Sequence, residues 1–390
     1  MRVMCASDSF KESLSARDAV AAMARGVMLA SPEAEVDLCP IADGGEGTVD
    51  ALIASTCGDL LMKSVCGPLP GVNVAAQWGM LGDIGRAIDG VRGGKAAVIE
   101  MASASGLTLI DELLRNPLNT TTFGIGELLL EALDHGAERI ILGLGGSATC
   151  DGGCGAAQAL GARFYDLRGT LIKGPITGGM LQEIGSIDLR GIDQRIRRVD
   201  LVIACDVNNP FYGPLGAAHV YAPQKGASHE QVKILDRGLE HLAVLIHKQL
   251  KVDVTEQPGA GAAGGLGGGA MAFFGGHLRR GVQLILEAVE FNSRIKMCDL
   301  CLTGEGKLDS QSLSGKATMG VVKAAAEHNV PAVTLVGRLG DVSEKVLAME
   351  FKNYRIIGEH LPLTESIEKA AELLEQVSAD VVRGFVSCSQ

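Results

Sequence analysis

Segments typical of strands alternate with segments typical of helices along almost the whole chain. Strand-like segments cover residues 2–6, 36–41, 96–100, 139–142, 201–205, 300–302 and 331–336. Helix-like segments cover residues 15–30, 48–55, 121–135 and 366–386, the first of them with Ser15 as a candidate N-cap. This alternation predicts an α/β fold, with largely parallel sheets covered by helices on both faces.

The length of 390 residues predicts two domains rather than one. Residues 67–71 and the glycine-rich stretch 258–269 look like points where the chain crosses between domains. We predict a discontinuous domain of the Rossmann or flavodoxin type, with a parallel sheet, formed by residues 1–67 and 285–390. A second α/β domain, residues 68–284, would be inserted between its two parts.

Composition excludes several classes of function. The formal charge of −11 argues against a nucleic-acid-binding protein, which needs a basic face. The chain contains no signal peptide and no run of about 18 apolar residues, so we expect neither secretion nor a membrane span. The ten cysteines form no regular framework, which favours reduced thiols and a cytoplasmic location. Any enzyme with this charge that handles anions must gather Lys side chains, backbone N–H groups and Mg²⁺ locally.

Two glycine motifs follow the G-x-G-x-x-[GA] pattern, residues 143–148 and 259–264. The first follows a predicted strand, so its N–H groups could bind a phosphate at a helix N-terminus, with a plain turn as the alternative. For the second, close approach of a ligand and tight packing between helices explain the glycines equally well. The two matches keep open a nicotinamide-dependent oxidoreductase of a small hydroxy acid. Against it, no clear strand-end acid follows the first match by about 20 residues.

Other nucleotide-binding signatures are missing. The chain has no G-x-x-x-x-G-K-[ST] motif, which excludes a P-loop, and it lacks the His-Arg-Asp and Asp-Phe-Gly motifs of protein kinases. It has acids in the loops after predicted strands instead, and such acids suit Mg²⁺ or a base that acts on a hydroxyl. These acids are Asp8, Asp43 with Glu46, Asp151, Asp206, and Glu305 with Asp309. Helix capping and turn formation are the alternative roles for each of them.

Lysines occur close to the same loops, at Lys11, Lys225, Lys307 and Lys316. They supply the local positive charge that anionic substrates require, although each could also be an ordinary surface lysine. In parallel α/β sheets the ligand crevice lies beyond the carboxyl ends of the strands. We therefore expect the acids, the lysines and the glycine motifs to meet at one edge.

Several ordered motifs resemble those of bacterial glycerate kinases of the glucarate and glyoxylate pathways. The matching segments are residues 8–15, 42–48, 145–149, 151–153, 204–207, 223–227, 258–265 and 303–309 with 311–312. The resemblance implies ATP- and Mg²⁺-dependent phosphorylation of D-glycerate in a cleft between two α/β domains. It implies 2-phosphoglycerate as the product, with 3-phosphoglycerate still open. Ser7 and Cys150 depart from the family pattern, which usually has Pro and Asn there, and Cys150 could bring a thiol near the site.

With this resemblance, we assign catalytic roles to Lys11, Asp206 and Asp309, and metal binding to Asp151 and Asp206. Which aspartate binds Mg²⁺ and which acts on the hydroxyl stays open. The residues assigned to substrate and phosphate are Asp8, Ser9, Asp43, Gly145, Gly146, Ser147, Thr149, Gln224, Lys225, Glu305, Lys307 and Lys316. Glycerate and ATP are the expected partners, with no nucleic acid and no membrane, in a monomer or homodimer.

Overall fold

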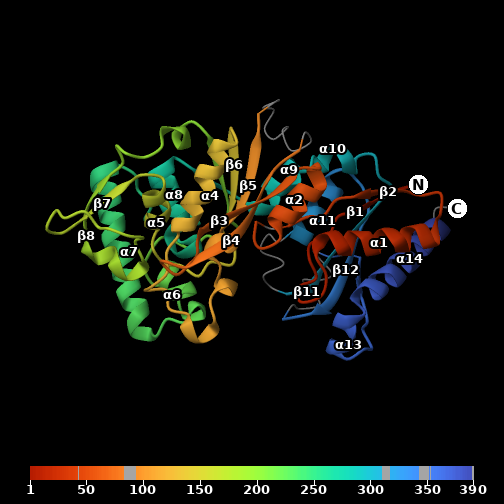
Figure 1. Cartoon of the computed structure of the whole chain (residues 1–390). Helices are drawn as coiled ribbons and strands as arrows, with labels where there is room; N and C mark the ends of the chain where they lie inside the picture. Colours follow the sequence, from red (N-terminus) through yellow and green to blue (C-terminus); the bar gives the residue numbers. More distant parts are fainter. Residues whose placement is uncertain (43, 83–93, 310–316, 342–350, 352, 389–390) are drawn as a thin grey trace.

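The computed structural model describes the chain except residues 43, 83–93, 310–316, 342–350, 352 and 389–390. Its strands form two main sheets in an elongated molecule, with β3, β4, β5 and β6 near the middle and β1, β2, β11 and β12 toward the end that carries both termini (Figure 1). Helices cover the faces of these sheets. The predicted α/β fold class with parallel strands is therefore confirmed.

The first sheet has five strands, and all of its pairings are parallel. Its strands are β1 (Arg2–Cys5), β2 (Glu35–Leu38), β11 (Leu300–Leu308), β12 (Ala332–Leu339) and β13 (Tyr354–Ile356). The spatial order is β13-β12-β11-β1-β2. Numbered within this sheet, that is the 2-1-3-4-5 order of flavodoxin-like folds, whose direction of winding reverses between β1 and β11.

The second sheet has six strands in the order β10-β9-β6-β5-β4-β3. They are β3 (Asp59–Cys66), β4 (Asn73–Met80), β5 (Ala96–Glu100), β6 (Arg139–Gly143), β9 (Asp200–Ala204) and β10 (His277–Arg279). The last four run parallel, whereas β4 is antiparallel to both β3 and β5. Residues 67–71, which the sequence suggested as a crossing point between domains, are the turn of the β3–β4 hairpin. In this turn the Gly67 N–H donates to the carbonyl of Val72.

A small antiparallel pair, β7 (Arg163–Asp166) and β8 (Ile184–Asp188), completes the strands of the described residues. Helices α1 (Ala16–Ala30) and α14 (Ala370–Cys388) pack against each other beside the first sheet. The other helices are α2 (Thr48–Thr56), α3 (Met101–Ser105), α4 (Phe123–Asp134), α5 (Cys154–Ala159), α6 (Ala217–Tyr221), α7 (His229–Leu250), α8 (Leu266–Phe274), α9 (Gly281–Ala288), α10 (Phe291–Ile295), α11 (Ala317–Glu327) and α13 (Leu363–Glu368). None of the helices in these described parts is long and apolar enough to cross a bilayer.

Local signals explain several helix boundaries. Ser15 is the predicted N-cap of α1, and its hydroxyl accepts the N–H of Asp18 at 3.1 Å. The single closing helix predicted over residues 366–386 is instead two helices, α13 and α14, which Lys369 separates in a non-helical conformation. The pattern of apolar residues continues across Lys369, so the sequence pattern did not reveal the break between the two helices.

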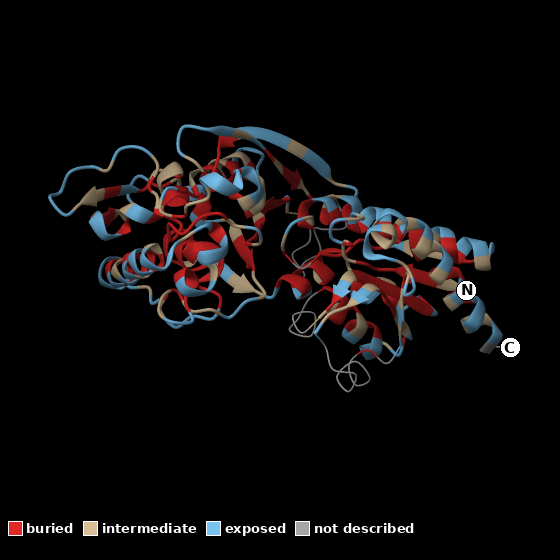
Figure 2. Ribbon diagram, turned by 90° about the horizontal axis from the view of Figure 1, so that it is seen from below, coloured by how far each residue is buried: buried red, intermediate tan, exposed pale blue. Residues whose placement is uncertain are grey.

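The middle strands of the second sheet bury both faces (Figure 2). Alternate residues, such as Ile140 and Leu142, pack into a core with α4, α5, α7 and α8. The residues between them point the other way, because side chains alternate along a strand. Val98, Ile141 and Val202 thus join a second apolar cluster, which also contains residues of β1, β11, α2, α9 and α11. We call this second cluster the shared core, because both sheets contribute to it.

The sheet pairings also bear on the predicted domain boundaries, which remain a proposal. A boundary after residue 67 would separate β3 from β4, although the two strands pair along their whole length. The second predicted boundary, between residues 284 and 285, would cut α9. We therefore propose boundaries between α2 and β3 and between β10 and α9.

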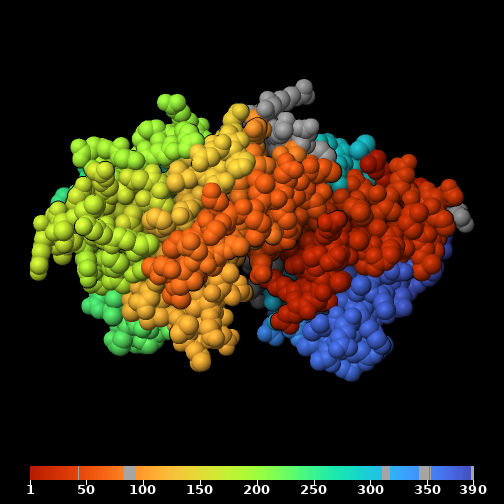
Figure 3. Space-filling view, viewed as in Figure 1, coloured from red at the N-terminus to blue at the C-terminus, as the bar shows by residue number. Residues whose placement is uncertain are grey.

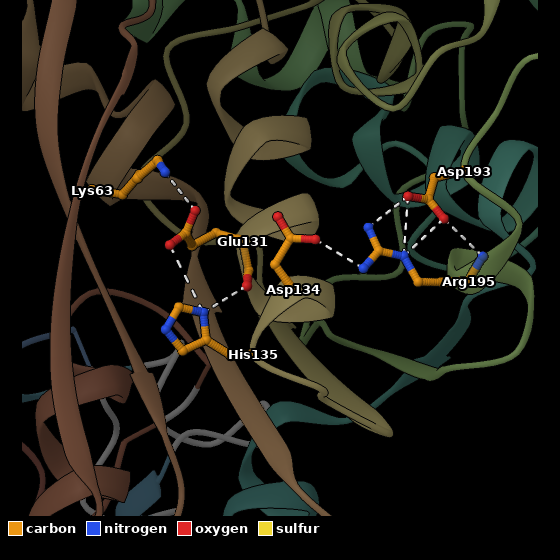
Figure 4. A network of polar contacts seen from close by, with 6 residues as sticks. All are labelled: Lys63, Glu131, Asp134, His135, Asp193 and Arg195. Carbon is orange, nitrogen blue, oxygen red and sulfur yellow. Dashed lines mark hydrogen bonds and ion pairs between the residues drawn. The ribbon is translucent and has the colours of Figure 1, made fainter.

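A polar network on the outer side of the second sheet links β3, α4 and the turn at residues 193–197 (Figure 4). Lys63 contacts Glu131 at 2.6 Å, and Arg195 contacts Asp134 at 2.8 Å and Asp193 at 2.7 Å. The side chain of Arg195 is 48% exposed, and exposed ion pairs of this kind contribute only about 0–1 kcal/mol each. The network connects elements at the edge of the second sheet. Its residues do not line the cavities described next.

Candidate active site

A cavity of about 470 Å³, here called the main pocket, lies where the strand-end loops of both sheets meet. Figure 3 shows the surface hollowed on its lower side, between the parts of the molecule that contain the two sheets. The lining residues from the first part are Asp8, Ser9, Lys11 and Gly44–Glu46. Those from the second are Leu107, Leu144–Ser147, Ala204–Val207, Tyr221, Gln224, Lys225, Ala262 and Ala263.

A second cavity of about 280 Å³, here called the side pocket, lies at the carboxyl ends of β1 and β11. Its lining residues are Asp8–Ser13, Glu305–Lys307, Asp309, Gly337, Arg338, Ile357, Leu363, Ser366, Ile367 and Ala370. Asp8, Ser9 and Lys11 line both pockets and form the wall between them. The sequence predicted one anion crevice, whereas the structure has two adjoining pockets at these loops.

Lys225 is the most constrained charged group of the main pocket. It follows α6, its residue is only 2% exposed, and its Nζ donates to Ser147 Oγ at 2.7 Å and to the carbonyl of Thr149 at 2.8 Å. Burial lowers the pKa of this lysine from its usual 10.5 to about 8, and the neighbouring Asp151 partly opposes that shift. A buried ammonium group is costly unless it has partners, so a third, anionic partner in the pocket would be bound strongly.

Ser147 is held in place by backbone bonds on both sides. The N–H of Leu107 donates to the carbonyl of Gly146, and the N–H of Ala148 donates to the carbonyl of Ser105. These two bonds form a bridge between Gly106 and Ser147. The serine hydroxyl therefore faces the pocket with Lys225 fixed beside it.

Asp151 is an internal anchor and does not line either pocket. It is completely buried, and its carboxylate accepts bonds from the N–H and hydroxyl of Thr122 and from the N–H groups of Gly153 and Gly155. With its oxygens engaged in this way it has no access to a metal in the pocket. The geometry thus opposes the hypothesis that Asp151 binds Mg²⁺. Burial raises its pKa, and these hydrogen bonds oppose the shift.

The two aspartates predicted to be catalytic lie in different pockets. Asp206 follows β9 in the main pocket, and its Oδ1 accepts the N–H of Gly281, the first residue of α9, at 3.0 Å. Asp309 lies in the side pocket, with Lys307 Nζ 3.5 Å from its carboxylate. The structure therefore does not bring this pair together around one reacting hydroxyl.

The shared wall between the pockets is attached to β11. The Asp8 N–H donates to the carbonyl oxygen of Gly304. The Ser7 hydroxyl donates to the same oxygen at 3.0 Å, a polar contact that a proline at this position could not make. Two bonds between Phe10 and Leu14 close a tight turn that presents Lys11 to solvent. Within this turn Glu12 has φ 68°, a conformation that strains a residue other than glycine.

The first glycine motif fits loop packing better than phosphate binding at a helix. Helix α5 begins only at Cys154, so residues 143–148 do not open a helix as the hypothesis required. A Cβ added at Gly143 would lie 2.6 Å from the carbonyl oxygen of Gly44, and one at Gly145 would lie 2.5 Å from the Cα of Gly45. These glycines let loops from the two sheets touch, which removes the main support for a dinucleotide site.

The second glycine motif also serves backbone packing. A Cβ added at Gly264 would lie 2.0 Å from the carbonyl oxygen of Thr149, and one at Gly269 would lie 2.1 Å from that of Gly152. The stretch thus packs against the loop that carries Asp151. Of the two explanations for these glycines, close packing is the one that the geometry favours.

The other assigned residues are distributed as follows. Gln224 lies exposed at the rim of the main pocket, whereas Thr149 is buried behind it. Glu305 and Lys307 line the side pocket. Cys150 is buried, and burial raises the pKa of its thiol to about 12, so the thiol stays protonated at neutral pH. Asp43 and Lys316 lie outside the described residues.

Sequence reasoning missed Glu100, the last residue of β5. Its carboxylate accepts the N–H of Val49 at 2.6 Å, at the start of α2, and so holds the loop Gly44–Gly47 against the second sheet. Burial raises its pKa from 4.5 to about 7, partly offset by the backbone N–H groups of Val49 and Gly47. Its position at a strand end is the same signal that identified Asp206, so the rule that was applied could have found it.

A magnesium site, if the pocket contains one, would depend on few protein ligands. Among the described residues no group of three or more His, Cys, Asp or Glu side chains could hold a metal. Mg²⁺ often uses only one or two carboxylates together with water and substrate phosphates. Asp8, Glu46 and Asp206 are the carboxylates that line the main pocket, so this donor set fits such an ion.

Comparisons with known proteins identify the family of the chain. The model of the glycerate kinase family matches residues 3–386. A glycerate kinase of Bacillus subtilis is 45% identical over 98% of this chain and 97% of its own length. Glycerate 2-kinase of Escherichia coli is 46% identical over 87% of this chain and 86% of its own.

A solved structure extends the agreement to the fold. A crystal structure from Salmonella typhimurium LT2, of a protein with the provisional name glycerate kinase 2, superposes with a TM-score of 0.85. It is 38% identical, and the match covers 100% of this chain and 99% of that chain. On the combined evidence of sequence and fold, the chain belongs to the glycerate kinase family.

Proposed function

We propose that this enzyme transfers the γ-phosphate of ATP to D-glycerate, with 2-phosphoglycerate as the product. The observation that carries the proposal is the buried ammonium of Lys225 beside the Ser147 hydroxyl, in a pocket that also contains Asp206 and Lys11. A small hydroxy acid has a carboxylate that can bind the buried ammonium of Lys225 and a hydroxyl that can approach the Asp206 carboxylate. The E. coli relative is named a 2-kinase, which supports the 2-hydroxyl as acceptor.

Each residue would have a distinct part in the transfer. Lys225 and Ser147 would bind the glycerate carboxylate, and the Asp206 carboxylate would orient the attacking hydroxyl and accept its proton. The Gly281 N–H donates to one Asp206 oxygen and so helps to orient this carboxylate at the pocket. Lys11, on the opposite wall, would stabilise charge on the transferred group.

Magnesium would be held by Asp8 and Glu46 together with the phosphates, and it would neutralise the developing negative charge. Of the earlier alternatives for Asp206, base and metal ligand, we prefer the base. Asp309 lies in the other pocket and would act on a different part of the substrates.

A coupled assay of ADP release with D-glycerate tests this function, with ³¹P NMR to identify the product. We expect ATP-dependent turnover and the phosphorus signal of 2-phosphoglycerate. A signal of 3-phosphoglycerate would overturn the regiochemistry alone, and turnover with another hydroxy acid but not with glycerate would overturn the substrate. Turnover that persists after chelation of Mg²⁺ would exclude the metal.

The remaining expectations concern the location of the enzyme in the cell and its oligomeric state. The nine cysteines of the described chain whose state the structure gives are all free, which agrees with the proposed cytoplasmic location, where thiols stay reduced. A monomer or homodimer remains the proposal for the assembly, and light scattering in solution would distinguish the two.

A further inference from the structure

We propose that the side pocket binds the adenosine part of ATP, so that the triphosphate crosses the shared wall at Lys11 and reaches glycerate in the main pocket. This inference rests on the proposed function, since it divides the two substrates between two cavities. It assigns a ligand to the side pocket, and roles to residues of β12 and α13 and to Ile357, which follows β13.

The topology of the first sheet favours this location. The strand order reverses between β1 and β11, and the side pocket lies at the carboxyl ends of these two strands. Open α/β sheets bind their ligands at such switch points, because the loops diverge there and leave a crevice. The main pocket lies beside this position, between the loops of two sheets, where a second substrate can approach.

The side pocket has an apolar wall that a nucleoside can use. Ile357, Leu363, Ile367 and Ala370 line it from one side, and Leu363 is 50% exposed. Glycerate has no apolar surface large enough to cover these side chains, whereas a purine ring does. Pockets for small ligands typically combine apolar walls with a few placed polar groups.

Polar groups of the same pocket suit a ribose. Glu12 and Asp309 can accept hydrogen bonds from ribose hydroxyls, while Lys307 and Arg338 lie on neighbouring strands at the same register. The main pocket supplies a different set, the buried ammonium of Lys225 with the Ser147 hydroxyl beside it. The two cavities are therefore chemically complementary, one for a nucleoside and one for small anions.

Size and continuity support the same division. A cavity of about 280 Å³ lies just below the roughly 300–1,000 Å³ typical of pockets for drug-sized ligands, so it would hold part of ATP and not the whole molecule. Asp8, Ser9 and Lys11 line both cavities, so a ligand that fills one can extend past them into the other. The strained Glu12 lies in the turn between the pockets, and such strain is concentrated at ligand-binding sites.

The test fills the side pocket with a large side chain. Ser366 in α13 lines it, so Ser366→Trp should obstruct adenosine. Thr364→Trp is the matched control, because Thr364 is an exposed residue of the same helix that does not line the pocket. The measurements are the KM of ATP, the KM of glycerate, and the inhibition constants of adenosine and of inorganic tripolyphosphate.

We expect Ser366→Trp to raise the KM of ATP and the inhibition constant of adenosine at least about tenfold. The KM of glycerate and the inhibition constant of tripolyphosphate should stay within about twofold, because both ligands bind outside the side pocket. Thr364→Trp should leave all four constants unchanged. If Ser366→Trp unfolds, Leu363→Ser provides the second variant, with the same pattern at smaller amplitude.

Three results would overturn the inference. One is an unchanged KM of ATP in a folded Ser366→Trp enzyme, and another is a rise confined to the KM of glycerate. The third is an equal loss of affinity for tripolyphosphate and ATP. Each of these requires wild-type enzyme that turns over glycerate with ATP, so failure of the proposed function itself would be seen separately, as no turnover.

Discussion

The two walls of the main pocket differ in how firmly they hold their lysines. On the wall from the second sheet, Lys225 is 2% exposed and bonded to two oxygens, and Asp151 anchors the loop beside it through four hydrogen bonds. On the wall from the first sheet, Lys11 is exposed on a tight turn. The position of Lys225 is therefore fixed by its partners before any ligand binds. The exposed side chain of Lys11 can adjust its position to a ligand.

The largest effect should come from the firm wall. Lys225→Met removes the charge but keeps a buried chain of similar length, so we expect kcat/KM for glycerate to fall about 100- to 1,000-fold, as when one preorganised donor is lost. Lys11→Met should cost less and mainly raise the KM of ATP. Steady-state kinetics, with circular dichroism as the folding control, measure both. Equal losses in the two variants would remove the distinction between the walls.

Substitutions of the two aspartates should also differ in their effects on activity. If Asp206 is the base, Asp206→Asn should lower kcat about 100-fold or more, because an amide cannot accept the proton. From the sequence alone we also assigned a catalytic role to Asp309. Since Asp309 lies in the side pocket, we now expect that variant to change mainly the KM of ATP. Near-normal kcat in Asp206→Asn would disprove the assignment of the base.

The pH dependence of glycerate binding tests the burial of Lys225. Because burial lowers its pKa to about 8, the ammonium is charged below that pH and loses its proton above it. The KM of glycerate should therefore rise as pH increases through about 8. The same rise should persist in Lys11→Met and disappear in Lys225→Met. A KM that is constant up to pH 9.5 in the wild type would contradict the role of Lys225 in binding.

Glu100 should give the smallest change in activity and a visible change in stability. Its pKa is raised from 4.5 to about 7, so the folded state prefers the protonated acid, and stability present below pH 4.5 is lost as pH rises through 7. Glu100→Gln keeps an acceptor for Val49 without this titration. Between pH 4.5 and 7 the variant should lose less unfolding free energy than the wild type, by at most roughly 3 kcal/mol. Parallel denaturation curves over this range would refute the expectation.

Sequence reasoning succeeded where local patterns dictate the outcome. The segments 96–100, 139–142 and 201–205 are mostly apolar and mostly buried, so their pattern identified β5, β6 and β9 nearly to the residue. The exposed residues of β3 gave no such signal. Ser147 and Asp206 lie in loops that follow strands and line the main pocket, whereas Lys225 lies in the short helical turn after α6.

The site predictions that the geometry opposes, and the alternatives that the sequence left open, share a different cause. Whether Asp151 binds an ion or backbone N–H groups depends on Thr122, which lies 29 residues away in the chain. Whether Gly145 and Gly264 approach a ligand or another loop depends on which loops the fold brings against them. These contacts depend on the tertiary structure, so the identity of the residue and of its neighbours in the sequence does not reveal them.

The shared core limits how the enzyme can move. Val98, Val202 and their neighbours pack into the same apolar cluster as residues of β1 and β11, so swinging the two sheets apart would expose that cluster to water. Large hydrophobic contacts of this kind suppress the free hinge motion that is otherwise expected between domains. Substrates would then enter through displacement of loops and a slight sliding of the packed helices. The two sheets would keep their relative position during this motion.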